Sequence, residues 1–505
     1  MNSNLNKKSG ILLHPTALPG NYGIGEIGPE AYNFIDHLVD MQQSVWQILP
    51  LGPTDIYNSP YSSISTFAGN PLLISFELLI EDGLLDPALL TNCKKNNSDK
   101  VLFKDLIDFK IPILNEISMQ FEINASSEMK ISFNQFCENN SYWLDDYSNY
   151  YALKIENQCT SWINWHSHIV KNEENIYQAK IIQFIFHEQW SRLQKYCTNH
   201  GIEIIGDMPI YVGYDSSDVY SNRDLFQLDN DGKMKYQGGC PPCEFQENGQ
   251  LWGTPLYDWD KHSQNNFEWW KKRFKKLFEM VDIIRLDHFI GYTKYYSIPI
   301  NDKTAHNGKW NKAPGDQLFN VLQSSLSNFS VIAEDLGDAT LDVINLRDKF
   351  QFPGMLVLQF EIEKMLSKKD FHSNSIVCTG THDNDTLLGW INSLKDGDSN
   401  KNIFTKSKLL ELFNSSSKNI HWEIINYALK TSSDRVVMPI QDILEKDSRS
   451  RFNMPGTLSD NNWSWKMKEN DLTQLIKNKL LKLTVDSGRN INMLNSKKRY
   501  ESKKS

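Results

Sequence analysis

Three acidic residues each follow directly after a short run of strand-forming residues, at widely separated places in this 505-residue chain. They are Asp287 in Ile283–His288, Glu334 in Val331–Gly337 and Asp383 in Val377–Asn384. A parallel barrel presents its catalytic groups in this way, at the C-terminal ends of several strands around one pocket. Two such carboxylates suffice for glycosidic bond chemistry, and a third can stabilise charge on the sugar. The pattern therefore predicts a barrel enzyme that works on sugars.

Short apolar runs that end in glycine, proline or aspartate are the candidate strands. They are Gly10–His14, Val45–Pro50, Glu203–Val212, Val281–His288, Ser330–Asp335, Met355–Phe360, Ser375–Gly380 and Arg435–Pro439. Their near-continuous apolar character is typical of strands buried on both faces of a parallel sheet. Amphipathic stretches lie between several of them, such as Phe267 to Met280. Eight strands with helices between them predict an α/β fold, a (β/α)8 TIM barrel.

The uneven spacing of the strands predicts where the barrel is interrupted. The second and third candidate strands are much farther apart than one helix and two loops require. Periodic aromatic residues in this gap predict an inserted, mostly helical subdomain at 75–175. The segment 214–260 is rich in Gly, Pro, Asn and Asp, which predicts a loop over the active site. The catalytic barrel is thus expected to span 10–480, followed by a polar, lysine-rich, disordered tail at 484–505.

Composition narrows the partners and the compartment. A net charge of −9 argues against nucleic acid, which requires a basic face. No apolar stretch approaches the roughly 18 residues of a membrane-spanning helix, so no membrane partner is expected. The 7 cysteines are an odd number without framework spacing, which predicts reduced thiols and a cytoplasmic location. The 14 tryptophans suit either a large core or stacking platforms for sugar rings.

A series of short motifs, in one fixed order, resembles a known family. The motifs are Leu13–Gly20, Trp46–Pro53, Ser59–Tyr61, Phe67–Pro71, Gly206–Ile210, Gly249–Gly253, Arg285–His288, Ala333–Gly337, Gly380–Thr386, Met454–Thr457 and Asn462–Trp465. Together they resemble the 4-α-glucanotransferases, also called amylomaltases or disproportionating enzymes, of the α-amylase clan. The resemblance implies transfer of α-1,4-glucan segments from a donor maltodextrin to the 4-hydroxyl of an acceptor glucan or glucose. It implies maltooligosaccharides and starch or glycogen fragments as partners, with glucose as an acceptor, and it implies no cofactor. Apart from a single C-x-x-C pair, no residue spacing suggests a metal site.

Residue chemistry and the resemblance agree on the roles of the acids. Retaining glycoside chemistry needs a nucleophile and an acid/base about 5 Å apart. Asp287 is the candidate nucleophile, because Arg285 shares its face of the strand and favours the ionised carboxylate. Glu334 is the candidate acid/base, because its apolar setting should raise its pKa, whereas Asp335 should point the other way. The resemblance adds Asp383 as a third carboxylate that stabilises the transition state. A strand-bracing ion pair, a helix cap and an Asx turn are the structural alternatives for these three acids.

The resemblance also implies a set of substrate contacts. These are two histidines that bind the sugar at the cleavage point, an aspartate and an arginine that support the nucleophile, a tyrosine stacked under that sugar, and a glutamine and a tryptophan on the acceptor side. In this sequence they are, in that order, His288 and His382, Asp207 and Arg285, Tyr61, and Gln250 and Trp252. Core packing is the alternative interpretation for the tyrosine and the tryptophan.

The acceptor-side loop departs from the family pattern. After two prolines the family has an acid and an aromatic residue, whereas this chain has Cys243 and Glu244. An α-1,4-glucan hydrolase on the same scaffold therefore stays open as an alternative, because water and the acceptor compete for the same intermediate. Cys240 and Cys243 form a C-x-x-C pair, which is compatible with two loop thiols, a reversible disulfide or half of a zinc site. No second pair is present in the sequence to complete a zinc site.

Two rivals come from other functional classes. A metal-dependent barrel hydrolase could use His14, His288 and His382, but such barrels usually have a His-x-His pair at the first strand, and this chain has only His14 there. Metal content of the purified protein would reveal it. A non-catalytic glucan-binding protein is the other rival. It predicts the loss of at least one catalytic carboxylate, and all three are present.

Overall fold

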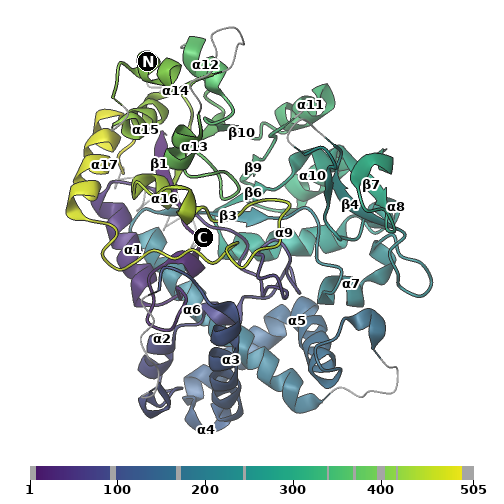
Figure 1. Ribbon diagram of the computed structural model, residues 1–505. Helices are drawn as coiled ribbons and strands as arrows, with labels where there is room; N and C mark the ends of the chain where they lie inside the picture. The colour runs from purple at the N-terminus through teal and green to yellow at the C-terminus, as the bar shows by residue number, and fades with distance from the viewer. Residues whose placement is uncertain are drawn as a thin grey trace.

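Eight parallel strands form a closed barrel in the computed structural model, which describes residues 7–90, 98–165, 172–242, 246–337, 340–367, 371–394, 404–416 and 419–491. The strands are β1 Lys8–Leu12, β2 Val45–Gln47, β3 Glu203–Met208, β6 Ile283–Leu286, β9 Val331–Ala333, β10 Gly354–Val357, β11 Ser375–Cys378 and β12 Arg435–Pro439. Around the barrel their order is β1-β12-β11-β10-β9-β6-β3-β2. Figure 1 labels β1, β10, β9, β6 and β3. The eight barrel strands correspond to the eight candidate strands, so the prediction of a (β/α)8 barrel is confirmed. Several predicted runs continue past the strand ends into loops.

The strand register brings the candidate residues to one rim of the barrel. Asp207 of β3 pairs with Arg285 of β6, and Leu286 of β6 pairs with Ala333 of β9. Because these strands are parallel and in this register, the residues that follow β6 and β9 leave the barrel side by side. Those residues are Asp287 and Glu334.

Helices surround the barrel and connect its strands. The α-helices outside the β2–β3 connection are α1 Pro29–Asp40, α7 Ser217–Ser221, α8 Trp259–Gln264, α9 Glu268–Met280, α10 Gly315–Ser325, α11 Leu341–Lys349, α12 Ile362–Ser367, α13 Leu387–Ser393, α14 Lys406–Phe413, α15 Ile420–Lys430, α16 Ile440–Ile443 and α17 Gln474–Asp486. Short 3-10 helices are η1 Pro15–Ala17, η2 Pro71–Leu73, η3 Pro87–Leu90, η4 Trp162–Asn164, η5 Arg223–Leu225, η6 Phe289–Tyr292, η7 Ala305–Asn307 and η8 Ser448–Ser450. The predicted amphipathic helix is α9, which buries Trp270 and Phe274 completely.

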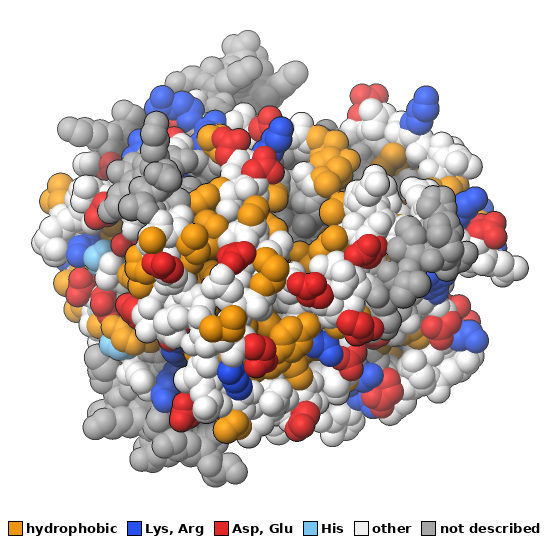
Figure 2. All heavy atoms as spheres, turned by 90° about the horizontal axis from the view of Figure 1, so that it is seen from below, with side chains coloured by type: hydrophobic (Ala, Val, Ile, Leu, Met, Phe, Trp, Pro, Cys, Tyr) orange, Lys and Arg blue, Asp and Glu red, His pale blue; other side chains and the backbone are white. Residues whose placement is uncertain are grey.

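The connection between β2 and β3 is mostly helical. It contains α2 Phe76–Glu81, α3 Phe103–Met119, α4 Phe121–Asn124, α5 Ser127–Glu156 and α6 Glu173–Asn199, which form the lower part of the molecule in Figure 1. Helix α6 also packs on the barrel layer, where the Trp190 indole donates a 2.9 Å hydrogen bond to the carbonyl of Met280. Figure 2 views this end from below, and hydrophobic side chains gather near the middle of the face with charged side chains among them. Residues 91–97 and 166–171 of the predicted subdomain lie outside the described residues.

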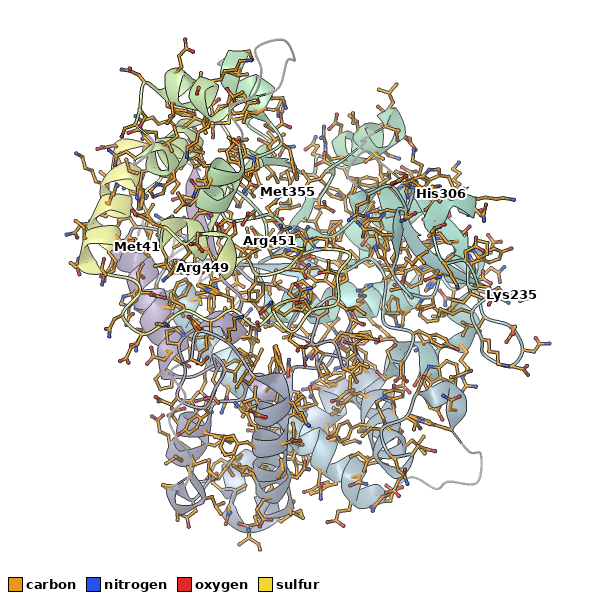
Figure 3. The ribbon with its side chains drawn as sticks, viewed as in Figure 1. Met41, Lys235, His306, Met355, Arg449 and Arg451 are labelled. Carbon is orange, nitrogen blue, oxygen red and sulfur yellow. The ribbon has the colours of Figure 1, made fainter. Side chains whose placement is uncertain are left out.

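The segment 214–260 contains two strands as well as loops. These are β4 Tyr236–Cys240 and β5 Gln250–Leu251, which join β7 Lys294–Pro299 and β8 Lys309–Lys312 in an antiparallel sheet of order β5-β4-β7-β8. In Figure 3, Lys235 and His306 lie on the side of this second sheet and Met41 on the opposite side, with Arg451 and Met355 between them. The sequence pattern did not predict this sheet, because β4 contains two glycines and its partner β7 is distant in the chain.

The end of the chain differs from its prediction. Helix α17 runs to Asp486, and beyond it Arg489 is fully buried. Its guanidinium donates hydrogen bonds to five backbone carbonyls of the described residues, including those of Leu429 and Ser433. A disordered tail from 484 is therefore wrong for 484–491, because a buried guanidinium anchors this segment. The rest of the predicted tail, 492–505, lies outside the described residues. Across the described ranges, none of the helices has the length and apolar character needed to cross a bilayer.

Candidate active site

One arginine contacts three carboxylates at the C-terminal rim of the barrel. Arg285 Nη1 donates to both carboxylate oxygens of Asp207 at 2.8 Å and to Asp287 Oδ1 at 3.0 Å. Arg285 Nη2 lies 4.0 Å from Glu334 Oε2. Burial works against the charge on this guanidinium, but Asp207 first, then Tyr61 and Asp287, raise the pKa of Arg285 well above its usual value. Arg285 is therefore a fixed positive charge between the two candidate catalytic acids.

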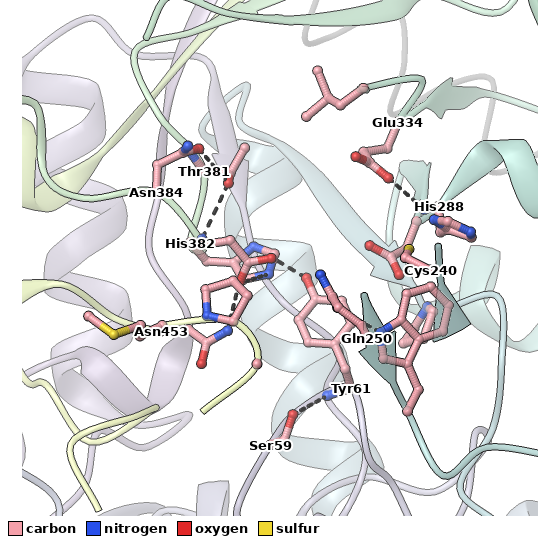
Figure 4. A pocket seen from close by; sticks show the side chains of 18 of the residues that line it. Ser59, Tyr61, Cys240, Gln250, His288, Glu334, Thr381, His382, Asn384 and Asn453 are labelled. Atoms are coloured by element: carbon pink, nitrogen blue, oxygen red, sulfur yellow. Dashed lines mark hydrogen bonds and ion pairs between the residues drawn. The ribbon is translucent and has the colours of Figure 1, made fainter. Parts of the chain in front are cut away.

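The environment of Glu334 favours the protonated form of its carboxyl group. Burial raises the pKa of Glu334 to about 8, against the opposing effect of Arg285. Its Oε2 accepts a 2.6 Å hydrogen bond from the backbone N–H of His288, and the two residues lie next to each other in Figure 4. Asp335 forms an ion pair with Arg347 and accepts a hydrogen bond from the backbone of Met355. Of the two neighbouring acids, therefore, only Glu334 lies with Asp207 and Asp287 around Arg285, as the strand alternation predicts. We call Arg285 and these three acids the Arg285 cluster.

The candidate third carboxylate lies across the cleft, beside an aromatic stack. The Tyr61 hydroxyl donates a 2.7 Å hydrogen bond to Asp207 Oδ2, and its ring stacks on His382 with centroids 4.8 Å apart. His382 Nε2 in turn lies 3.3 Å from Asp383 Oδ1. Tyr61 is partly exposed and lines the cleft, so its surroundings differ from those of a core tyrosine. A line of contacts thus connects Asp383 with the Arg285 cluster through Tyr61 and His382.

A tryptophan and a histidine form the wall on the side of the second sheet. The Trp252 indole N–H donates to Gln250 Oε1 at 2.7 Å, and its ring meets His288 edge-on with centroids 4.9 Å apart. Burial lowers the pKa of His288 to about 4, so its imidazole is neutral at physiological pH. Among the described residues, His288 Nε2 has no hydrogen-bond partner. That nitrogen is itself buried, although other atoms of His288 line the cleft.

All of these side chains except Asp207 line one large cleft. Its volume is about 3670 Å³, and it reaches from the barrel rim past β5 to residues 454–460, 462 and 463. The predicted residues on its wall are Tyr61, Gln250, Trp252, Arg285, Asp287, His288, Glu334, His382 and Asp383. Asp207 is 3 % exposed and lies behind Arg285. The described ranges contain no group of three or more His, Cys, Asp or Glu residues arranged to hold a metal ion.

Comparison with known proteins identifies the family. Residues 13–473 match the family model described as 4-alpha-glucanotransferase. This chain belongs to the 4-α-glucanotransferase family. The family and the transferase class expected from the ordered motifs are thereby confirmed.

Individual 4-α-glucanotransferases match almost the whole chain. That of Synechocystis sp. is 39% identical over 502 residues, which cover 96% of this chain and 98% of the relative. That of Thermus thermophilus is 37% identical, with 92% and 95% covered. The structure of the amylomaltase from Streptococcus agalactiae in complex with acarbose has a TM-score of 0.90 at 32% identity, and the match covers 96% of this chain and 100% of that one.

Within this 4-α-glucanotransferase scaffold, the cleft also contains residues that were not predicted as site residues, among them Arg451, Asn453 and Cys240. Arg451 and Asn453 line the cleft and donate hydrogen bonds to Asp383. Cys240 also lines the cleft, and Figure 4 shows it near Gln250. Asn453 directly precedes the motif that begins at Met454, so the motif boundary was the only signal for it. The altered loop residues Cys243 and Glu244, and with them the pairing of the two loop cysteines, lie outside the described residues.

Proposed function

We propose that this protein is a 4-α-glucanotransferase that moves α-1,4-glucan segments from a donor maltodextrin to the 4-hydroxyl of an acceptor glucan or glucose. The observation that carries the proposal is the arrangement of Asp287 and Glu334 on either side of the Arg285 guanidinium. The cleft of about 3670 Å³ is large enough for several sugar units. Family membership supports the same donor and acceptor class.

The mechanism that fits this arrangement is a retaining double displacement. In the first step Asp287 attacks the anomeric carbon while Glu334 gives its proton to the leaving glycosidic oxygen. A covalent glycosyl-enzyme forms, and the shortened glucan leaves. In the second step Glu334, now ionised, takes the proton from the acceptor hydroxyl, whose oxygen attacks the same carbon and releases Asp287. Both inversions occur at one carbon, so the α configuration is retained.

The other side chains bind the sugar at the cleavage point. His288 lies on the cleft wall beside Glu334, and Asp383 offers a carboxylate that stabilises positive charge on the sugar ring. Tyr61 provides a ring for stacking, held in place by its hydrogen bond to Asp207. Gln250 lies in β5 of the second sheet, and Trp252 directly follows that strand. Both residues suit contacts to the acceptor. Through such contacts an acceptor competes with water for the glycosyl-enzyme.

Incubation of the purified protein with maltotriose alone tests the proposal. Glucose together with a ladder of longer maltodextrins would identify the transferase. The Asp287→Asn variant should lose the ladder, with activity reduced at least about 10⁴-fold, because no covalent intermediate forms. Glucose and maltose without longer products would instead identify an α-1,4-glucan hydrolase. No turnover of maltotriose or longer maltodextrins would favour a binding protein.

We also infer a cytoplasmic location, because an odd number of scattered cysteines is typical of a protein whose thiols stay reduced. Plant relatives are described as chloroplastic or amyloplastic, so a plastid is the alternative known among relatives. Subcellular fractionation with an antibody against the protein tests the assignment.

A further inference from the structure

The loop that carries Asp383 is held by the segment that follows β12. Four residues of this segment, which we call the clasp, contact the loop 379–386 or the residue after it: Asp442, Ser448, Arg451 and Asn453. Asp442 accepts hydrogen bonds from the Thr379 hydroxyl at 2.6 Å and from the backbone N–H of Leu387 at 2.7 Å. The Ser448 hydroxyl donates to Asp385 Oδ2 at 2.7 Å. The clasp therefore fixes both ends of the loop.

The remaining two clasp residues contact Asp383 itself. Arg451 donates through Nη2 to the backbone carbonyl of Asp383 and through Nε, at 2.7 Å, to the carbonyl of Asn453. Asn453 Nδ2 donates to Asp383 Oδ1 at 2.6 Å. His382 Nε2 lies 3.3 Å from that same oxygen. Oδ1 of Asp383 is thus occupied by the protein, whereas no hydrogen bond or ion pair from the described residues occupies Oδ2.

Asp383 needs such a contact more than the other two carboxylates do. Asp287 and Glu334 follow directly after barrel strands and touch the buried Arg285, whereas the Asp383 side chain is 44% exposed on a loop. An exposed carboxylate rotates among several orientations unless a neighbour selects one of them. Asn453 is 9% exposed, so its amide is itself held in place. A hydrogen bond from a fixed donor to an ionised acceptor is among the stronger ones in proteins.

We propose that Asn453 is a positioning residue for Asp383: its amide holds Oδ1, so that Oδ2 faces the sugar at the cleavage point. This inference rests on the proposed function, in which Asp383 stabilises charge on that sugar. Asn453 acts through Asp383, and it is required for rate more than for glucan affinity. Arg451 supports the same orientation by joining the two backbones.

A double-mutant cycle tests the inference. Glucose release from maltotriose is measured for the wild type, Asn453→Ala, Asp383→Asn and the double variant, with kcat and KM determined for each. We expect Asn453→Ala to lower kcat about tenfold to a hundredfold, the loss associated with a hydrogen bond to a charged group, with little change in KM. In the Asp383→Asn background the same substitution should change the rate less than about twofold, because the carboxylate on which it acts is gone.

The control is Asn461→Ala, which lies in the same part of the chain but bonds the exposed Lys100 instead of the loop. It should retain wild-type kcat. Asn453→Asp keeps the shape of the side chain but replaces the amide donor by a carboxylate, so it should lower kcat at least as much as Asn453→Ala does. Thermal unfolding verifies that each variant is folded. Wild-type kcat in Asn453→Ala, or an equal loss in both backgrounds, would overturn the inference. An inactive wild type would overturn the proposed function instead.

Discussion

The Glu334 carboxylate lies 4.0 Å from the Arg285 guanidinium, yet its pKa is raised to about 8. Burial is the largest cause, and its effect exceeds the opposing attraction of Arg285. The arginine is closer to Asp287, with which it forms a 3.0 Å hydrogen bond. The same guanidinium therefore lies closer to the candidate nucleophile than to the candidate proton donor. A reaction that needs one group of each kind requires such a difference between its two acids.

Activity should fall as the pH rises through about 8. The first step uses the proton on Glu334, and that proton is lost above the pKa of this group. Initial rates of glucose release from maltotriose, measured from pH about 5 to about 10, test this expectation. A rate that stays constant through pH about 9 would contradict the assignment of Glu334 as the acid.

Glu334→Gln should make the protein more stable than the wild type at alkaline pH. The folded-state pKa of about 8 lies above the usual value of 4.5, so between these values the folded protein holds a proton that the unfolded chain has released. Wild-type stability is then lost as the pH rises across this range, whereas glutamine does not titrate. Melting temperatures at pH about 5 and about 9 should show a larger gain for the variant at the higher pH. An equal gain at both pH values would argue against the raised pKa.

Lys110→Met should destabilise the connection between the helical insertion and the barrel. Lys110 of α3 is fully buried and forms an ion pair with Glu26, which precedes α1, and it donates to the carbonyl of Leu72 at 2.8 Å. Without the lysine a buried acid loses its partner, which costs about 3 kcal/mol of unfolding free energy. Urea unfolding measures the loss, and the exposed Lys104→Met on the same helix is the control. Combining Lys110→Met with Glu26→Gln should recover part of the loss, and no recovery would contradict the ion-pair explanation.

Arg489→Ala should also destabilise the protein, and Arg489→Lys should restore only part of the loss. The buried guanidinium donates to the carbonyls of Lys8, Leu429, Thr431 and Ser433 at 2.7–2.9 Å. Removing it leaves buried carbonyls unsatisfied, at about 3 kcal/mol or more in total. A lysine ammonium presents its donors from one atom and does not reach the same spread of acceptors. Urea unfolding compares both variants with Arg449→Ala, an arginine whose side chain is 90% exposed. Full restoration by lysine would contradict the prediction.

Features encoded by neighbouring residues were predictable. The apolar runs marked all eight barrel strands, because a strand buried on both faces must be apolar along its length. The position of Arg285 two residues before Asp287 was sufficient to place both side chains on one face. The apolar residues before Glu334 indicated a raised pKa, and burial does raise it. Each of these inferences depends on a few consecutive residues.

Features that depend on pairs distant in the chain were not predictable. The strand β4 was not recognised, because a short glycine-containing segment becomes a strand only when β7 pairs with it. Arg489 was assigned to a polar tail, because nothing near it in the sequence indicates its partners. The carbonyls that accept its hydrogen bonds belong to β1 and to the segments around β12.

The sequence by itself determined the barrel, the family and the identity of the candidate catalytic acids, since apolar periodicity and ordered motifs are local properties of the chain. Only the tertiary structure decided which groups surround these acids. It placed Arg285 between Asp287 and Glu334, and it brought Asn453 to Asp383 from a segment 70 positions away. Burial, charge and hydrogen bonding depend on distance in space, and closing the barrel is what sets those distances.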